Sequence, residues 1–172
     1  EYSLLDGACR IKELVLRVKE LGQKAVAVTD HGNMFAAVEF YNECLAQGIK
    51  PIIGCEVYVA PRTRFDKLAK IDSSPYHLVL LCENNEGYQN LIKLVSAAYT
   101  EGFYSKPRVD VELLEKNHKG LICLSACLAG EIPRKLTNGD YEAAKQTALK
   151  YRDIFGRDNY FIELQNHKFA DQ

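Results

Sequence analysis

An aspartate and a histidine stand at the point where an apolar run of the chain stops. Residues 24–28 (Lys-Ala-Val-Ala-Val) are typical of a short buried strand, and Met34 opens an amphipathic helix, so Asp30 and His31 fall between strand and helix. In α/β folds this junction is where ligands and metals bind. A neutral imidazole there is a competent metal ligand, and a neighbouring carboxylate can fix its tautomer. The alternative is a turn in which Asp30 caps the helix, Gly32 gives backbone freedom and His31 is merely exposed.

Four further side chains with metal-binding chemistry lie inside or next to predicted elements. Glu56 interrupts an apolar run, and because an unpaired buried carboxylate is costly, it needs a cation, a hydrogen-bond network or a metal. His77 opens a strand, Cys127 follows one, and Asp6 precedes the first helix. Each also has a structural interpretation: a salt bridge for the glutamate, a core position for the histidine, apolar packing for the cysteine and a cap for the aspartate.

Taken together, these residues favour a metal site, because a parallel sheet brings strand ends close in space. A mixed set of carboxylate, imidazole and thiolate donors suits Zn, Mn or Fe, and carboxylates can bridge two ions. We therefore expect Asp6, His31, Glu56 and Cys127 to converge within a cluster roughly 10 Å across.

Composition limits the classes of function. The chain has 172 residues, is 47% hydrophobic and 26% charged, and carries a net charge of −1, which is typical of a soluble globular protein. A domain that grips nucleic acid by itself usually has a basic excess, and this chain has none. The longest apolar stretches have only strand length and residues 1–3 do not resemble a signal peptide, so we expect no membrane segment. Six scattered cysteines predict unpaired thiols and a cytoplasmic protein, and the Cys123–Cys127 spacing gives only a weak zinc-ribbon pattern.

Short apolar strands alternate with longer amphipathic helices, which is typical of a mostly parallel α/β sheet. We predict one domain over residues 1–172, with closure of the sheet into a barrel left open. The predicted strands are 24–28, 52–59, 77–81, 121–124 and 160–164, and the predicted helices are 11–21, 34–47, 84–99 (capped by Asn84), 111–116 and 141–155 (capped by Asp140). Residues 60–75 are polar and without apolar period, which predicts a surface loop or ribbon.

Several long segments of the chain form a recognisable set: 1–8 (EYSLLDGA), 29–33 (TDHGN), 49–56 (IKPIIGCE), 87–91 (GYQNL), 120–127 (GLICLSAC) and 163–167 (ELQNH). Together they resemble the PHP (polymerase and histidinol phosphatase) family, in the branch found at the N-terminus of bacterial replicative DNA polymerase alpha subunits. They occur in the expected order and cover essentially the whole chain.

The resemblance implies a distorted seven-stranded TIM-like β/α barrel with up to three divalent metals at its mouth. By motif position the family's ligands fall on the following residues: Asp6, His31, Glu56, His77 and Cys127. The family's His-x-His pair, expected before Glu1, and its Asp-x-His pair, expected beyond Gln172, are absent, so we expect an excerpt that lacks the first and last strands. A histidine at the start of its strand, as at position 77, is also awkward for a site at the C-terminal rim. We interpret Gln165, Asn166 and His167 as rim residues rather than ligands.

The resemblance further implies metal-assisted phosphoester hydrolysis, either 3′–5′ exonuclease or pyrophosphatase activity. In this interpretation His31 and Glu56 hold ions that activate water, and Asp30 orients the ligand histidine from behind. DNA polymerisation, with Mg, would belong to other domains, and DNA, a proofreading exonuclease subunit and replisome components would be the partners. Two alternatives stay open: a stand-alone phosphatase such as a histidinol-phosphate phosphatase, and a non-catalytic platform that docks a separate exonuclease.

Overall fold

The computed structural model describes residues 1–166 and 168, in which six strands and six helices form a mixed α/β arrangement. The strands are β1 (Ala25–Val28), β2 (Lys50–Val59), β3 (Tyr76–Cys82), β4 (Arg108–Val109), β5 (Leu121–Leu124) and β6 (Tyr160–Phe161). The helices are α1 (Ile11–Glu20), α2 (Ala37–Gln47), α3 (Asn85–Thr100), α4 (Val111–Lys116), α5 (Glu131–Thr137) and α6 (Tyr141–Phe155). The order of strands in the sheet is β1-β2-β3-β5-β6, with β4 paired to β2, and this path is open within the described residues.

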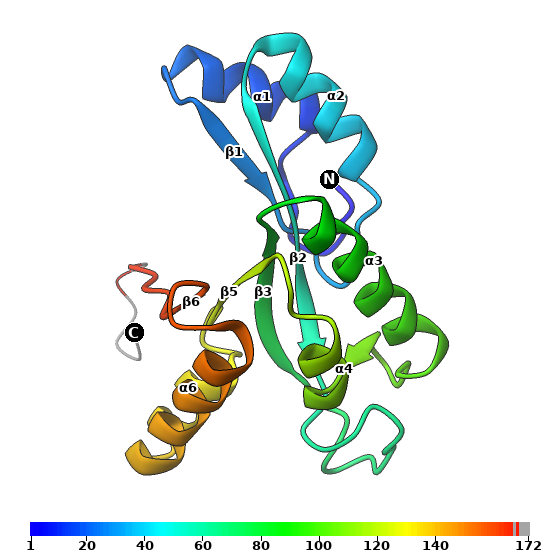
Figure 1. Cartoon of the computed structure of the whole chain (residues 1–172), viewed down its shortest axis with the longest axis vertical. Coiled ribbons are helices and arrows are strands. Elements are labelled where there is room, and N and C mark those ends of the chain that lie inside the picture. Colours follow the sequence, from blue (N-terminus) through cyan, green and yellow to red (C-terminus); the bar gives the residue numbers. More distant parts are fainter. Residues whose placement is uncertain (167, 169–172) are drawn as a thin grey trace.

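The long strand β2 connects two parts of the molecule (Figure 1). Its first half pairs in parallel with β1 as far as Ile53, and its second half pairs with β3 from Gly54 onward. A Cβ atom on Gly54 would lie 2.5 Å from the carbonyl oxygen of Leu80, so only glycine allows β3 to approach at the point where β2 changes partner. One apolar cluster lies among α1, α2 and β1, and a larger one lies among the remaining strands and α3, α4, α5 and α6.

The prediction of a mostly parallel sheet is wrong for β3, which runs antiparallel to both of its neighbours, β2 and β5. The physical reason is the connection between β2 and β3. A parallel pair needs a crossover, usually a helix, whereas residues 60–75 contain no helix and let the chain turn back beside β2. This direction places the start of β3 beside the end of β2, which removes the difficulty raised by His77 at the start of its strand.

Most other elements lie where the sequence predicts them. The helices at 111–116 and 141–155 and the strand at 121–124 are confirmed to the residue. The predicted helix caps are also confirmed, since Asn84 and Asp140 each accept a hydrogen bond from the backbone three residues on, both at 3.0 Å. The sequence analysis missed β4 and α5, which are short, and the predicted strand 160–164 is reduced to β6.

The connection over residues 60–75 is a loop, as predicted, but its polar residues are not all solvated. The Arg108 side chain, at the start of β4, is fully buried and donates hydrogen bonds to four backbone carbonyls; their residues are Arg64, Asp66, Asp72 and Gly102. Asp72 is also fully buried and accepts two hydrogen bonds from Arg62, at 3.1 and 2.5 Å. These contacts fix the loop beyond the C-terminal end of β2 (Figure 1). Among the described residues, no helix combines the length and apolar character of a membrane span.

Candidate metal centre

Five side chains from distant parts of the sequence form one continuous series of contacts. Nε2 of His31 lies 3.0 Å from a carboxylate oxygen of Asp6, and Nδ1 of the same ring lies 2.7 Å from Oε1 of Glu56. Oε1 of Glu56 also lies 2.9 Å from Nδ1 of His77. Sγ of Cys127 lies 3.6 Å from that same nitrogen. The structure thus brings together all five residues that the sequence singled out as ligands.

The strand ladders explain why His31, Glu56 and His77 meet. His31 pairs in parallel with Glu56 beyond the end of β1, because the Glu56 N–H donates to the Asp30 carbonyl and the Gly32 N–H donates to the Glu56 carbonyl, at 3.1 and 2.8 Å. On the other side of β2, Tyr58 is opposite His77. Since alternate residues of a strand share a face, Glu56 is the diagonal neighbour of His77 on that face.

Cys127 reaches the site from the loop that follows β5. The N–H of His77 donates to the carbonyl of Ala129 at 3.2 Å, and the N–H of Gly130 donates to the carbonyl of Cys127 at 2.8 Å. Ala126 has φ of 62°, a left-handed conformation that is uncommon for a residue with a side chain. The loop therefore turns sharply just before the thiol and is tied by backbone hydrogen bonds to the start of β3.

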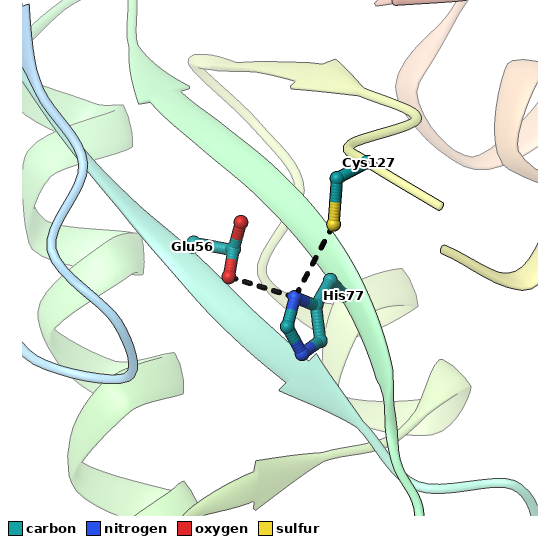
Figure 2. Close-up of side chains that lie close together, drawn as sticks. All are labelled: Glu56, His77 and Cys127. Carbon is teal, nitrogen blue, oxygen red and sulfur yellow. Dashed lines mark hydrogen bonds and ion pairs between the residues drawn. The ribbon is translucent and has the colours of Figure 1, made fainter. Parts of the chain in front are cut away.

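Glu56, His77 and Cys127 form the tightest donor group (Figure 2), with one ligand atom of each within 4.8 Å of the other two. A tetrahedral ion with ligands at about 2.0–2.3 Å holds its ligand atoms roughly 3.3–3.8 Å apart. The separations of 2.9 and 3.6 Å at His77 are therefore close to those of a coordination shell. One carboxylate, one imidazole and one thiolate also match the donor preferences of zinc and of related transition ions. The residues present fit a divalent metal.

The electrostatics of the group favour a protonated His77 beside the carboxylate of Glu56. The hydrogen bond with Cys127 and that with Glu56 raise the pKa of His77 to about 9. Burial acts to raise the pKa of Glu56, but the contacts with His77 and His31 outweigh it, and the net pKa is lowered. The hydrogen bond with His77 also lowers the pKa of the Cys127 thiol, whereas burial raises that of Cys55 to about 12. Cys127 is thus prepared to act as a thiolate ligand.

Asp30 does not contact the His31 ring, which differs from the role expected from the sequence. Both ring nitrogens face other carboxylates, those of Asp6 and Glu56. Asp30 is buried and instead accepts a hydrogen bond from the Ser3 hydroxyl at 2.6 Å, and that hydroxyl accepts the backbone N–H of His31 at 3.0 Å. Asp30 therefore supports the backbone of His31 through Ser3. Its second carboxylate oxygen is buried without a hydrogen-bond partner in the described part of the chain.

Tyr58 and Ser3 are two site residues that the sequence analysis missed. The ring of Tyr58 meets that of His77 edge to face, with centroids 5.2 Å apart, and it also packs against Gly32. Tyr58 stands two positions after Glu56 in the same strand, so the strand period contained the signal. Ser3 carried no comparable signal, because its role depends on how residues 1–10 fold back over the end of β1.

A cleft of about 670 Å³ opens beside Cys127. Gln165 and Asn166 help to line it, together with Glu163, and neither amide belongs to the close donor group. His167, the third predicted rim residue, lies outside the described residues. All six cysteines lie within the described part of the chain and all are free thiols, as predicted, with Cys127 the one beside the donor histidine.

The raised pKa of His77 predicts a pH-dependent metal affinity. A metal can bind Nδ1 only after its proton leaves, and the proton is held until about pH 9. Affinity should therefore increase as pH rises from 6.5 to 9, by up to about tenfold per unit for each proton released. Titration with Co²⁺, followed by its charge-transfer band with the Cys127 thiolate, measures this. An affinity that stays constant over this range would contradict the assigned role of His77.

Comparison with known proteins places this geometry in a family. Residues 1–167 match the family model described as "PHP domain". The chain is 56% identical over 172 residues to DNA polymerase III subunit alpha of Treponema pallidum, and covers 15% of that protein. It is 49% identical over 180 residues to the same subunit of Deinococcus radiodurans, of which it covers 13%, and 48% identical over 176 residues to that of Thermus aquaticus, of which it covers 14%. In each case at least 99% of this chain is aligned.

A solved amidohydrolase from Chromobacterium violaceum, with bound sulfate and no metal, aligns with 91% of this chain and 81% of its own, at 14% identity and a TM-score of 0.45. The family rests instead on the match along the sequence, which spans residues 1–167 and so includes the five converging side chains. By that match, this chain belongs to the PHP domain family.

Proposed function

We propose that the chain is the N-terminal, metal-binding PHP domain of a bacterial replicative DNA polymerase alpha subunit, and that its own chemistry is metal-dependent hydrolysis of phosphoesters. The observation that carries this proposal is the convergence of Glu56, His77 and Cys127 on one point, with His31 and Asp6 continuing the series. The substrate is the 3′ end of a DNA strand or pyrophosphate. The three bacterial relatives support the polymerase context, although the chain spans only 13–15% of their length.

The same proposal extends to the fold and its metal content. The mixed sheet is part of a single domain, a distorted TIM-like barrel. It holds up to three divalent ions of Zn, Mn or Fe, while Mg serves polymerisation elsewhere in the protein. The protein works in the cytoplasm, with DNA, a proofreading exonuclease subunit and other replisome components as partners.

The roles of the chain's own residues follow from their contacts. Glu56, His77 and Cys127 would hold one ion, and His31, which contacts the same carboxylate, would hold a neighbouring one. Asp6, with its side chain 62% exposed, fixes the orientation of the His31 ring from the solvent side. A bound divalent ion supplies activation of water and stabilisation of charge on phosphoryl oxygens.

A non-catalytic platform is the second candidate, favoured by the thiolate ligand, since cysteine is common in structural zinc sites. In that case the metal stabilises the domain on which an exonuclease docks. A stand-alone phosphatase is less well supported, because the proteins from Treponema pallidum, Deinococcus radiodurans and Thermus aquaticus are polymerase subunits.

The experiment compares metal content with hydrolysis in the complete polypeptide, purified free of any associated exonuclease. Chelation should remove the metal and abolish release of 3′ nucleotides or hydrolysis of pyrophosphate. Zn²⁺, Mn²⁺ or Fe²⁺ should restore that hydrolysis, and Mg²⁺ alone should restore only polymerisation. A wild-type protein that binds metal but shows no metal-dependent hydrolysis would contradict the enzymatic proposal and support the non-catalytic platform instead.

A further inference from the structure

The loop before β4 brings one lysine to the edge of the metal centre. Nζ of Lys106 lies 5.3 Å from the centroid of the Tyr58 ring. The same ring lies edge to face against His77, with centroids 5.2 Å apart. One aromatic ring therefore separates the ammonium of Lys106 from a side chain of the donor group.

The backbone around this lysine is held firmly. The next residue, Pro107, packs so closely on the loop after β1 that a Cβ on Gly32 would lie 3.0 Å from its ring. The residue after that, Arg108, is fixed by its hydrogen bonds to four backbone carbonyls. Ser105, just before the lysine, has φ of 60°, which costs of order 1–3 kcal/mol unless the surroundings impose it. The fold thus maintains an unfavourable conformation next to Lys106.

Among the described residues, the ammonium of Lys106 contacts the Tyr58 ring but pairs with no carboxylate. The side chain is exposed, and none of the ion pairs between described residues includes it, whereas the nearby Arg62 and Arg64 each pair with carboxylates. Its surroundings at the site are acidic, with Asp6 and Glu56 in the series of contacts. A cation at the edge of such a site favours the approach of an anionic substrate.

We infer that Lys106 binds a phosphate group of the substrate at the edge of the metal centre, and this inference rests on the proposed function. An ammonium on a flexible stem binds phosphate as a point charge, and the Tyr58 ring holds it in place through a cation–π contact. The phosphate is either the group under hydrolysis or its neighbour in a polynucleotide, since both present the same oxygens.

The test measures phosphate binding in the complete polypeptide loaded with Co²⁺, with inorganic phosphate as the probe. The visible spectrum of Co²⁺ bound with Cys127 reports binding directly, independently of turnover. Lys106→Gln should weaken the apparent affinity for phosphate about tenfold, as expected for loss of one charge-assisted hydrogen bond. Lys106→Arg should restore it to within about threefold. Lys145→Gln, which removes an exposed lysine of α6, should leave it unchanged.

Equal phosphate affinity in wild type and Lys106→Gln would overturn the inference, as would a wild-type spectrum that phosphate does not change. Hydrolysis measured in parallel separates the two proposals. Phosphate binding that depends on Lys106 without any hydrolysis supports the lysine's role and contradicts the enzymatic function. Hydrolysis together with phosphate binding that is unchanged in Lys106→Gln supports the enzymatic function and contradicts the lysine's role. Affinity for a short oligonucleotide should be measured in the same way. If Lys106→Gln weakens oligonucleotide binding more than binding of inorganic phosphate, the lysine contacts the neighbouring backbone phosphate. If the two losses are equal, it contacts the group under hydrolysis.

Discussion

Glu56→Ala is expected to empty the metal centre and to abolish phosphoester hydrolysis by the complete polypeptide. One oxygen of Glu56 contacts both His31 and His77, at 2.7 and 2.9 Å, so its loss removes a ligand and separates the two histidines. Loss of a partner outside the coordination shell typically costs 10–100-fold in metal affinity, so loss of this ligand should cost more than about 100-fold. His31→Ala should act in the same direction.

Metal content by mass spectrometry and hydrolysis rates should be measured on the same preparations, with polymerisation as a third readout. Polymerisation should fall only as far as loss of metal destabilises the domain. Glu115→Ala, an exposed glutamate of α4 whose carboxylate makes no ion pair within the described residues, is the matched control and should keep its metal. Wild-type metal content in Glu56→Ala would refute the site, and hydrolysis that survives loss of metal would locate the activity elsewhere.

Arg108→Met is expected to destabilise the region around the 60–75 loop by about 3–5 kcal/mol. Methionine retains apolar volume but donates no hydrogen bond, so four carbonyls lose their donor, at original distances of 2.9–3.2 Å. Each buried carbonyl left without a partner costs about 1–3 kcal/mol, and water recovers part of this where the loop can open.

Hydrogen exchange by mass spectrometry measures this effect locally in the complete polypeptide, where a single unfolding transition is not defined. Peptides covering residues 60–75 and 102–110 should exchange faster in Arg108→Met. Arg152→Met is the control, because its exposed guanidinium pairs, among the residues that the structure describes, only with Asp153 and should contribute less than about 1 kcal/mol. Unchanged exchange around the loop would show that the buried hydrogen bonds contribute little.

The candidate ligands could be predicted because burying a polar side chain costs free energy, and such a side chain can be recognised from its neighbours in the sequence. A glutamate inside an apolar strand and a histidine after one require partners wherever the strands go. The direction of β3 was not predictable in the same way, since it depends on a connection without a helix, whose order comes from Arg108, a residue far along the chain. The route by which Asp30 supports His31 was not predictable for a similar reason. Because Asp30 is next to His31 in the sequence, contact between its carboxylate and the His31 ring was expected. The ladder instead turns the ring towards Glu56, and the Asp30 carboxylate accepts a hydrogen bond from Ser3.

The change of partner along β2 has a consequence for how the domain transmits motion. Between Ile53 and Gly54 the strand leaves the ladder with β1 and joins the ladder with β3, and Glu56 lies just beyond that joint. Of its two histidine neighbours, His31 belongs to the first side and His77 to the second. Metal ions held by Glu56 together with these two histidines would link the two ladders, so metal occupancy would set how stiffly one half of the domain follows the other.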